Sequence, residues 1–145
     1  MKLFFAGSFD PYTIGHHNIV QRALAMGFEV VVGVGVNPDK TPGCSIDRRL
    51  DSIRRIYSDN ASVSVVAYSG LSVKAAVQAG ATALLRGVRT MADYEYERSM
   101  AQTNRDISGM ETILLFSEPE YGHVSSSMVR ELEKYGQSVE KYIVK

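Results

Sequence analysis

Lys2-Leu3-Phe4-Phe5-Ala6 runs directly into Gly7-Ser8-Phe9-Asp10-Pro11-Tyr12-Thr13-Ile14-Gly15-His16. The first five residues form a short apolar run bounded by turn residues, which predicts a buried strand. After the turn, apolar residues recur at helical spacing through Leu24, which predicts a helix. Backbone N–H groups lie unpaired at the start of a helix, and anions bind there. This stretch therefore predicts a strand, a turn and an anion-binding helix start that carries His16.

The rest of the chain repeats the same alternation of strand and helix. We expect strands at residues 2–6, 29–36, 62–67, 81–85 and 112–116. We expect helices at residues 15–26, 45–58, 71–78, 91–107 and 126–135, with a last helical turn or two within 138–144. This order is typical of βαβ units. It predicts an α/β fold, a Rossmann-like open five-stranded parallel sheet with helices on both faces.

The informative loops all follow predicted strands. Right-handed crossovers bring the carboxyl ends of parallel strands to one edge of the sheet, and ligands bind at that edge where the strand order reverses. We therefore expect these loops to share one site. They are residues 7–15, 37–44, 69–72, 86–89 and 117–127.

Size and composition limit the class of protein. The chain has 145 residues, and we expect residues 1–145 to form a single domain. Sixteen basic and 16 acidic residues give no net charge, which argues against nucleic-acid and membrane-surface partners. Cys44 is the only cysteine, and Gly7 and Asp10 interrupt the apolar start, so we expect a cytoplasmic protein without a secretory signal.

The turn before the first helix offers several groups to a phosphate. Gly7 allows close approach to the backbone, Ser8 offers a hydroxyl, and a ring nitrogen of His16 can donate to a phosphate oxygen. His17 points about 100° away on a helix and is not expected to take part.

Two further segments offer groups to phosphates. Arg86-Gly87-Val88-Arg89 places two guanidinium groups after a strand, where they suit phosphate recognition. On the helix that follows, Glu97 can face the site and bind a sugar hydroxyl. Ser125-Ser126-Ser127 before a helix predicts a second phosphate cradle, although capping alone would also explain a serine there.

Other kinds of site are not indicated. His16, His17 and His123 do not have the spacing of zinc ligands, so no protein metal site is expected. The chain has no nucleophile elbow of the G-x-S-x-G type and no P-loop.

Taken together, these motifs resemble a known family. Thr13-x-Gly15-His16 resembles the (H/T)xGH signature of the nucleotidyltransferase superfamily, and residues 124–130 resemble its I-S-S-[ST]-x-[VI]-[RK] motif. Thr13, Arg86-Gly87-Val88-Arg89 and the run from Asp93 to Glu97 are most similar to the bacterial phosphopantetheine adenylyltransferases.

The resemblance implies an activity and a set of roles. It implies transfer of AMP from ATP to 4'-phosphopantetheine, giving dephospho-coenzyme A and pyrophosphate, with Mg²⁺ bridging ATP oxygens and with the chain in a homohexamer. His16, Lys40 and Arg86 would be catalytic. The acceptor would lie against Ser8, Lys40, Ser72 and Arg86. ATP would contact Ser8, Phe9, His16, Gly87, Val88, Arg89, Glu97, Tyr121, Gly122, His123, Val124, Ser125, Ser126 and Ser127.

Two alternatives stay open on the sequence. One is a nucleotidyltransferase for another phosphorylated acceptor, such as a mononucleotide or a phosphorylated polyol. The other is a non-catalytic nucleotide-binding sensor on the same fold, against which the set of His16, Lys40 and Arg86 argues.

Overall fold

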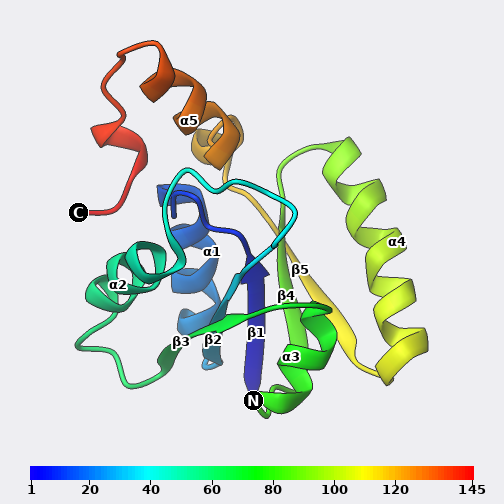
Figure 1. The fold of residues 1–145 in the computed structure, drawn as a ribbon. Helices are drawn as coiled ribbons and strands as arrows, with labels where there is room; N and C mark the ends of the chain where they lie inside the picture. The colour runs from blue at the N-terminus through cyan, green and yellow to red at the C-terminus, as the bar shows by residue number, and fades with distance from the viewer.

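Five parallel strands form a single open sheet in the computed structural model, which describes residues 1–145 (Figure 1). The strands are β1 (Lys2–Gly7), β2 (Glu29–Gly35), β3 (Val63–Tyr68), β4 (Ala83–Val88) and β5 (Glu111–Phe116). Their order across the sheet is β3-β2-β1-β4-β5, and every pairing is parallel. The predicted Rossmann-like fold is confirmed.

Helices cover both faces of this sheet. They are α1 (Ile14–Ala25), α2 (Ile46–Ile56), α3 (Ser72–Gln78), α4 (Met91–Ser108) and α5 (Ser126–Lys134), with short 3₁₀ helices η1 (Pro119–Tyr121) and η2 (Glu140–Tyr142). Helices α1 and α2 pack on one face, and α3 and α4 on the other (Figure 1). None of these helices is long and apolar enough to cross a bilayer.

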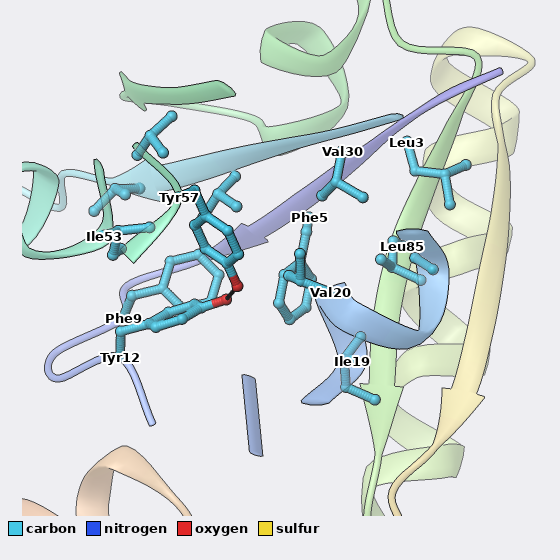
Figure 2. Packing of buried hydrophobic residues seen from close by; sticks show 14 of the residues in the cluster. Leu3, Phe5, Phe9, Tyr12, Ile19, Val20, Val30, Ile53, Tyr57 and Leu85 are labelled. Carbon is cyan, nitrogen blue, oxygen red and sulfur yellow. Dashed lines mark hydrogen bonds between the residues drawn. The ribbon is translucent and has the colours of Figure 1, made fainter. Parts of the chain in front are cut away.

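The central strand β1 supplies side chains to both cores. Leu3 and Phe5 lie in the cluster beneath α1 and α2, whereas Phe4 and Ala6 lie in the smaller cluster beneath α3. This alternation follows from the two-residue period of a strand. Figure 2 shows the larger cluster, where Phe5 lies among Val20, Val30 and Leu85. A continuous apolar run is what a strand covered on both faces requires.

Local signals mark the element boundaries. The side chain of Ser45 caps α2 by accepting a hydrogen bond from the Arg48 N–H at 3.3 Å, as an N-cap serine does. Gly27 ends α1 in the left-handed region with φ of 88°, a conformation that glycine adopts without steric cost. Most predicted boundaries therefore lie within two residues of those observed.

Two segments differ from the prediction. Strand β4 continues through Val88, so Arg86 and Gly87 belong to the sheet and not to a loop, because the ladder to β5 extends from Ala83 to Val88. The C-terminal segment has only the 3₁₀ turn η2, after which Ile143 forms an isolated antiparallel bridge with Thr13.

The strand order creates a reversal point between β1 and β4. The chain runs from β1 outward through β2 to β3, then crosses to β4 and continues to β5 on the other side. The loops that follow β1 and β4 therefore leave the sheet in opposite directions and open a crevice, the usual ligand position in such folds.

Candidate active site

One cleft of about 380 Å³ lies at the carboxyl ends of β1 and β4. It brings together segments that are far apart in the sequence: the β1–α1 turn, the end of β4, the start of α4 and the start of α5. Three of the five loops that were expected to share one site, residues 7–15, 86–89 and 117–127, line this cleft, whereas residues 37–44 and 69–72 do not. The predicted residues that line it are Ser8, Phe9, His16, Arg86, Gly87, Arg89, Glu97, Tyr121, Val124, Ser125, Ser126 and Ser127.

His16 is fixed by the helix that it opens. Thr13 is the N-cap of α1, and its side chain accepts a hydrogen bond from the His16 N–H at 3.3 Å. In return, Nδ1 of His16 accepts from the Thr13 N–H at 3.0 Å. This is a capping box in which histidine replaces the usual Glu or Gln. Because Nδ1 is the acceptor, Nε2 carries the proton of the neutral ring.

The surroundings keep this imidazole neutral. Burial, followed by the positive charges of Arg89 and Arg86, lowers the pKa of His16 to about 3. The neutral imidazole is therefore the form present at neutral pH, and it offers a hydrogen-bond donor without being a cation. Phe9 and Tyr12 hold the ring, with centroids at 4.9 and 5.5 Å from that of His16.

Phe9 has an unusual backbone conformation for a residue with a side chain. Its φ is 49°, in the left-handed region, and its ring is buried against Phe5 and Tyr12. A Cβ on Gly7 would lie 2.9 Å from the Phe9 ring. Gly7 is thus required for the close approach of that ring as well as for any approach of a ligand to the backbone.

Arg86 and Glu97 form an ion pair beside the cleft, in which Glu97 is buried and Arg86 is partly exposed. Nε of Arg86 donates to both carboxylate oxygens of Glu97 at 2.9 and 3.0 Å, and Nη2 donates at 2.7 Å. Nη1 donates to the carbonyl of Ala6, on β1. Both residues were predicted to contact substrates, and their mutual pairing was not predicted. The carboxylate fixes the arginine and leaves the guanidinium partly exposed to the cleft.

Arg89 is held in a similar way by the start of α4. Its Nε donates to Asp93 at 3.2 Å, and its Nη1 donates to the carbonyl of Val124 at 3.3 Å. The two cleft arginines thus have one carboxylate each. The contact of Asp93 with Arg89 was not predicted from the sequence.

The three serines have different partners. Ser125 is the N-cap of α5, and its hydroxyl accepts from the Met128 N–H at 3.1 Å. The Ser126 hydroxyl donates to the carbonyl of Pro11 at 2.7 Å, which joins α5 to the β1–α1 turn. The Ser127 hydroxyl accepts from Nη2 of Arg130 at 3.3 Å. Capping of α5 therefore explains why a serine stands at position 125. All three serines at the start of α5 also line the cleft.

Two smaller cavities adjoin the cleft. Lys40 lines a cavity of about 370 Å³ that shares Ser8 with the cleft, and Ser72 lines one of about 190 Å³ that shares Arg86 and Glu97. The residues predicted to bind the acceptor are therefore distributed over three neighbouring cavities. Ser8 lines two of them, and Arg86 also lines two.

Three of the residues predicted to bind ATP lie outside the lining of the cleft. Val88 is buried within the sheet, Gly122 follows η1, and the ring of His123 lies 6.1 Å from that of Tyr142 in η2. Their assignment to ATP stays a prediction. Thr13 and Tyr96 line the cleft without having been predicted to do so, and the N-cap position of Thr13 was the available signal.

The donor set of the cleft suits a metal that arrives with a ligand. No cluster of three or more His, Cys, Asp or Glu side chains is arranged to hold an ion. The two carboxylates of the cleft, Asp93 and Glu97, are already paired with arginines. Mg²⁺ commonly keeps several waters and binds through substrate phosphates, which this arrangement allows.

Comparison with known proteins agrees with this geometry. The model of the cytidylyltransferase-like family matches residues 4–132. The phosphopantetheine adenylyltransferase of Bacteroides thetaiotaomicron is 44% identical over 142 residues, which cover 98% of this chain and 94% of that protein. The enzyme of the same name from Synechococcus sp. is 41% identical over 144 residues, covering 99% of this chain and 90% of that protein.

A solved structure shares the fold. The bifunctional NMN adenylyltransferase/ADP ribose pyrophosphatase from Francisella tularensis superposes with a TM-score of 0.69 at 14% identity. The match covers 98% of this chain and 44% of that longer chain. At this identity the likeness concerns the fold alone, whereas the sequence relatives match almost over their full length. By sequence, fold and site, the chain belongs to the phosphopantetheine adenylyltransferase family of the nucleotidyltransferase superfamily.

Proposed function

We propose that this chain is the enzyme that transfers the adenylyl group of ATP to 4'-phosphopantetheine, with dephospho-coenzyme A and pyrophosphate as products. A phosphate oxygen of the acceptor attacks the α-phosphorus, a new P–O bond forms, and the bond to the β-phosphate oxygen breaks. The observation that carries the proposal is the single cleft in which His16, two arginines and the start of α5 converge, in a chain with full-length relatives of this name.

In this proposal, the residues of the cleft align the acceptor phosphate with ATP and stabilise the negative charge that builds on the α-phosphate. The acceptor phosphate is ionised at neutral pH, so no general base is needed to activate it. His16 is neutral and has its proton on Nε2, so it donates to the α-phosphate as negative charge builds there. Arg86, Arg89 and the N–H groups at the start of α5 supply positive potential to the phosphates.

Lys40 and Ser8 complete the acceptor side in this proposal. Both line the cavity next to the cleft, and Arg130 lies in the same wall. An acceptor phosphate held there would lie beside the ATP phosphates, with Ser8 between the two spaces. This arrangement supports transfer between neighbouring phosphates, because positioning accounts for a large part of such catalysis.

We also propose that Mg²⁺ enters with ATP and neutralises phosphate charge during the transfer. The paired state of Asp93 and Glu97 supports this proposal, because neither carboxylate is free to form a protein cage. Removal of divalent ions by EDTA should abolish turnover, and added Mg²⁺ should restore it. Full turnover in EDTA would contradict this part of the proposal.

The finer assignments of location and assembly are proposals as well. The single free cysteine supports a cytoplasmic location. Exposed large apolar side chains on α3 and α4 support an oligomer, for which the family resemblance suggests a hexamer.

The decisive experiment measures pyrophosphate release by the purified protein. ATP and Mg²⁺ are mixed with phosphopantetheine, a mononucleotide or a phosphorylated polyol in parallel, and the adenylylated product is identified by mass. We expect rapid release with phosphopantetheine alone. Pyrophosphate release only with another acceptor would show that the chain is a nucleotidyltransferase for that acceptor. ATP binding without pyrophosphate release in the presence of any acceptor would favour a nucleotide-binding sensor.

A further inference from the structure

Arg49 on α2 is a buried cation without a counterion. Its residue is only 6% exposed, and it takes part in none of the ion pairs of the structure. A buried charge is costly unless it is well hydrogen-bonded, so its partners identify what the residue is for. No motif in the sequence had pointed to it.

Every hydrogen bond of this guanidinium goes to a backbone carbonyl. Nη1 donates to the carbonyls of Ser8 at 2.7 Å and Gly35 at 3.0 Å, and Nε donates to that of Cys44 at 3.1 Å. Ser8 belongs to the turn that leads to His16, Gly35 ends β2, and Cys44 ends the loop of residues 37–44 that carries Lys40. One side chain therefore joins three segments around the site.

Asp10 holds the same loop from the other side. Its carboxylate accepts from the Gly43 N–H at 2.7 Å and from the Cys44 N–H at 2.9 Å. Asp10 lies in the β1–α1 turn, and Nη1 of Arg130 donates to its carbonyl at 2.6 Å. The N–H of Cys44 is thus bound to Asp10 and its carbonyl to Arg49, which fixes the end of the Lys40 loop on the turn.

We propose that Arg49 is a positioning residue for the transfer reaction, which holds the Lys40 loop against the turn that carries Ser8 and His16. This proposal rests on the proposed function, since it places the acceptor phosphate relative to ATP. The planar guanidinium suits the task, because its N–H donors have fixed directions that a lysine ammonium does not reproduce. Arg49 also lines the cavity of Lys40, so its charge adds to a wall that favours a phosphate.

The test compares Arg49→Lys with Arg54→Lys. Arg54 lies on the same helix and also donates to a strand carbonyl, that of Val65 at 3.2 Å, but it is on the wall of neither the cleft nor the Lys40 cavity. Steady-state kinetics should show that Arg49→Lys raises KM for phosphopantetheine about tenfold and lowers kcat, with KM for ATP changed less than about twofold. Arg54→Lys should leave these constants at the wild-type values.

A double-mutant cycle asks whether Arg49 acts through Lys40. In the Lys40→Ala background, Arg49→Lys should change KM for the acceptor by less than about twofold, because the group that it positions is gone. The proposal would be overturned if Arg49→Lys raised KM for the acceptor as much in the Lys40→Ala background as in the wild type. It would also be overturned if Arg49→Lys alone left KM for the acceptor within twofold of the wild-type value. An equal rise of both KM values would overturn it too, since it would indicate general loosening.

Hydrogen exchange of the ligand-free protein separates the two proposals. Arg49→Lys should speed exchange of the Gly43 and Cys44 amides, and Arg54→Lys should not; unchanged exchange would overturn the positioning role. If the wild type forms no product with phosphopantetheine, the proposed function fails. Hydrogen exchange still reports whether Arg49 holds the Lys40 loop against the β1–α1 turn. Should Arg49→Lys not fold, Asp10→Asn removes one bond to the same loop and should give the same kinetic pattern, which a wild-type acceptor KM would refute.

Discussion

His16 combines a structural and a chemical task in one ring. Nδ1 closes the capping box of α1 with Thr13, and this bond leaves Nε2 as the only N–H of the neutral imidazole. A Glu or Gln at the same position would cap the helix but would not present the same rigid donor. The local structure therefore determines the tautomer, and the tautomer determines what the residue offers to a phosphate.

His16→Ala should lower kcat by about 10²–10³-fold, because comparable sites lose this much when one positioned donor is removed. ATP should still bind, since the arginines and the start of α5 remain. Pyrophosphate release gives kcat, and calorimetry gives ATP affinity. Loss of the hydrogen bond from the Thr13 N–H to the ring also costs stability, about 1 kcal/mol, so His16→Gln, which preserves the capping box, is the control for folding. Near-normal turnover of His16→Ala would refute the catalytic role.

The lowered pKa of His16 predicts a dependence of stability on pH. The unfolded ring has a pKa near 6.5 and the folded ring has one of about 3, so between these values the unfolded state binds the extra proton. Folding stability must therefore fall as the pH falls below about 6.5.

Urea unfolding at pH 7 and pH 5 measures this effect. The wild type should lose about 2 kcal/mol more than His16→Gln over this interval, because one pKa unit corresponds to about 1.4 kcal/mol. His17, whose pKa is also lowered by burial, is present in both proteins and cancels in the comparison. Equal losses in the two proteins would show that the ring of His16 titrates normally in the folded state.

At the scale of elements, the packing of β1 against β2 leaves no spare volume. Gly33 on β2 pairs with Ala6 on β1, and a Cβ on Gly33 would lie 2.2 Å from the ring of Phe4. Phe4 is fully buried in the cluster under α3. Glycine is needed at position 33 because the ring of Phe4 occupies the space that a side chain would fill. The backbone conformation of Gly33 does not require glycine.

Gly33→Ala should destabilise the protein by about 1–3 kcal/mol, since overpacking a full core forces side chains and backbone to shift. The free energy of unfolding from urea titration measures the loss. Gly122→Ala is a matched control, because the nearest atom to its added Cβ is the Pro119 carbonyl oxygen at 3.5 Å, an ordinary contact. A loss for Gly33→Ala no larger than for the control would contradict this account.

At the scale of the whole molecule, the strand order assembles the site. Helices α1 and α5 begin more than a hundred residues apart, yet Ser126 donates to the carbonyl of Pro11. Such contacts exist because the sheet is parallel with β4 and β5 on one side of β1, so that the loops after β1 and β5 leave the sheet at the same edge. The fold thus brings two helix starts and two arginines to one cleft.

The exposed apolar side chains of α3 and α4 lead to a prediction about assembly. They include Leu71 just before α3, Val77 on it, and Met91, Tyr96 and Ile107 on α4. Burial of this surface between copies would remove apolar area from water. Because the family resemblance suggests a hexamer, size-exclusion chromatography with light scattering should give about six chain masses. A monomer at micromolar concentration would contradict the proposed hexamer.

The elements and most of the segments that line the cleft could be predicted from the sequence because their signals are local. Strand runs, helix periodicity, the Ser45 cap and the Gly27 helix end depend on residues within a few positions of one another. The same locality explains the errors. Whether Arg86 lies in a loop or in the sheet depends on pairing with β5, which a window around Arg86 does not contain.

What the sequence by itself determined is the alternation of strands and helices, and the helix starts at His16 and Ser126 that line the cleft. Only the tertiary structure decided the hydrogen-bond partners. Arg86 pairs with Glu97, and the hydroxyl of Tyr57 bonds to Tyr12 and His17, as Figure 2 shows for the two tyrosines. Arg49 donates to the carbonyls of Ser8, Gly35 and Cys44. The physical reason is that these bonds join segments whose distance is set by strand order and helix packing. No short-range pattern of residues encodes that distance.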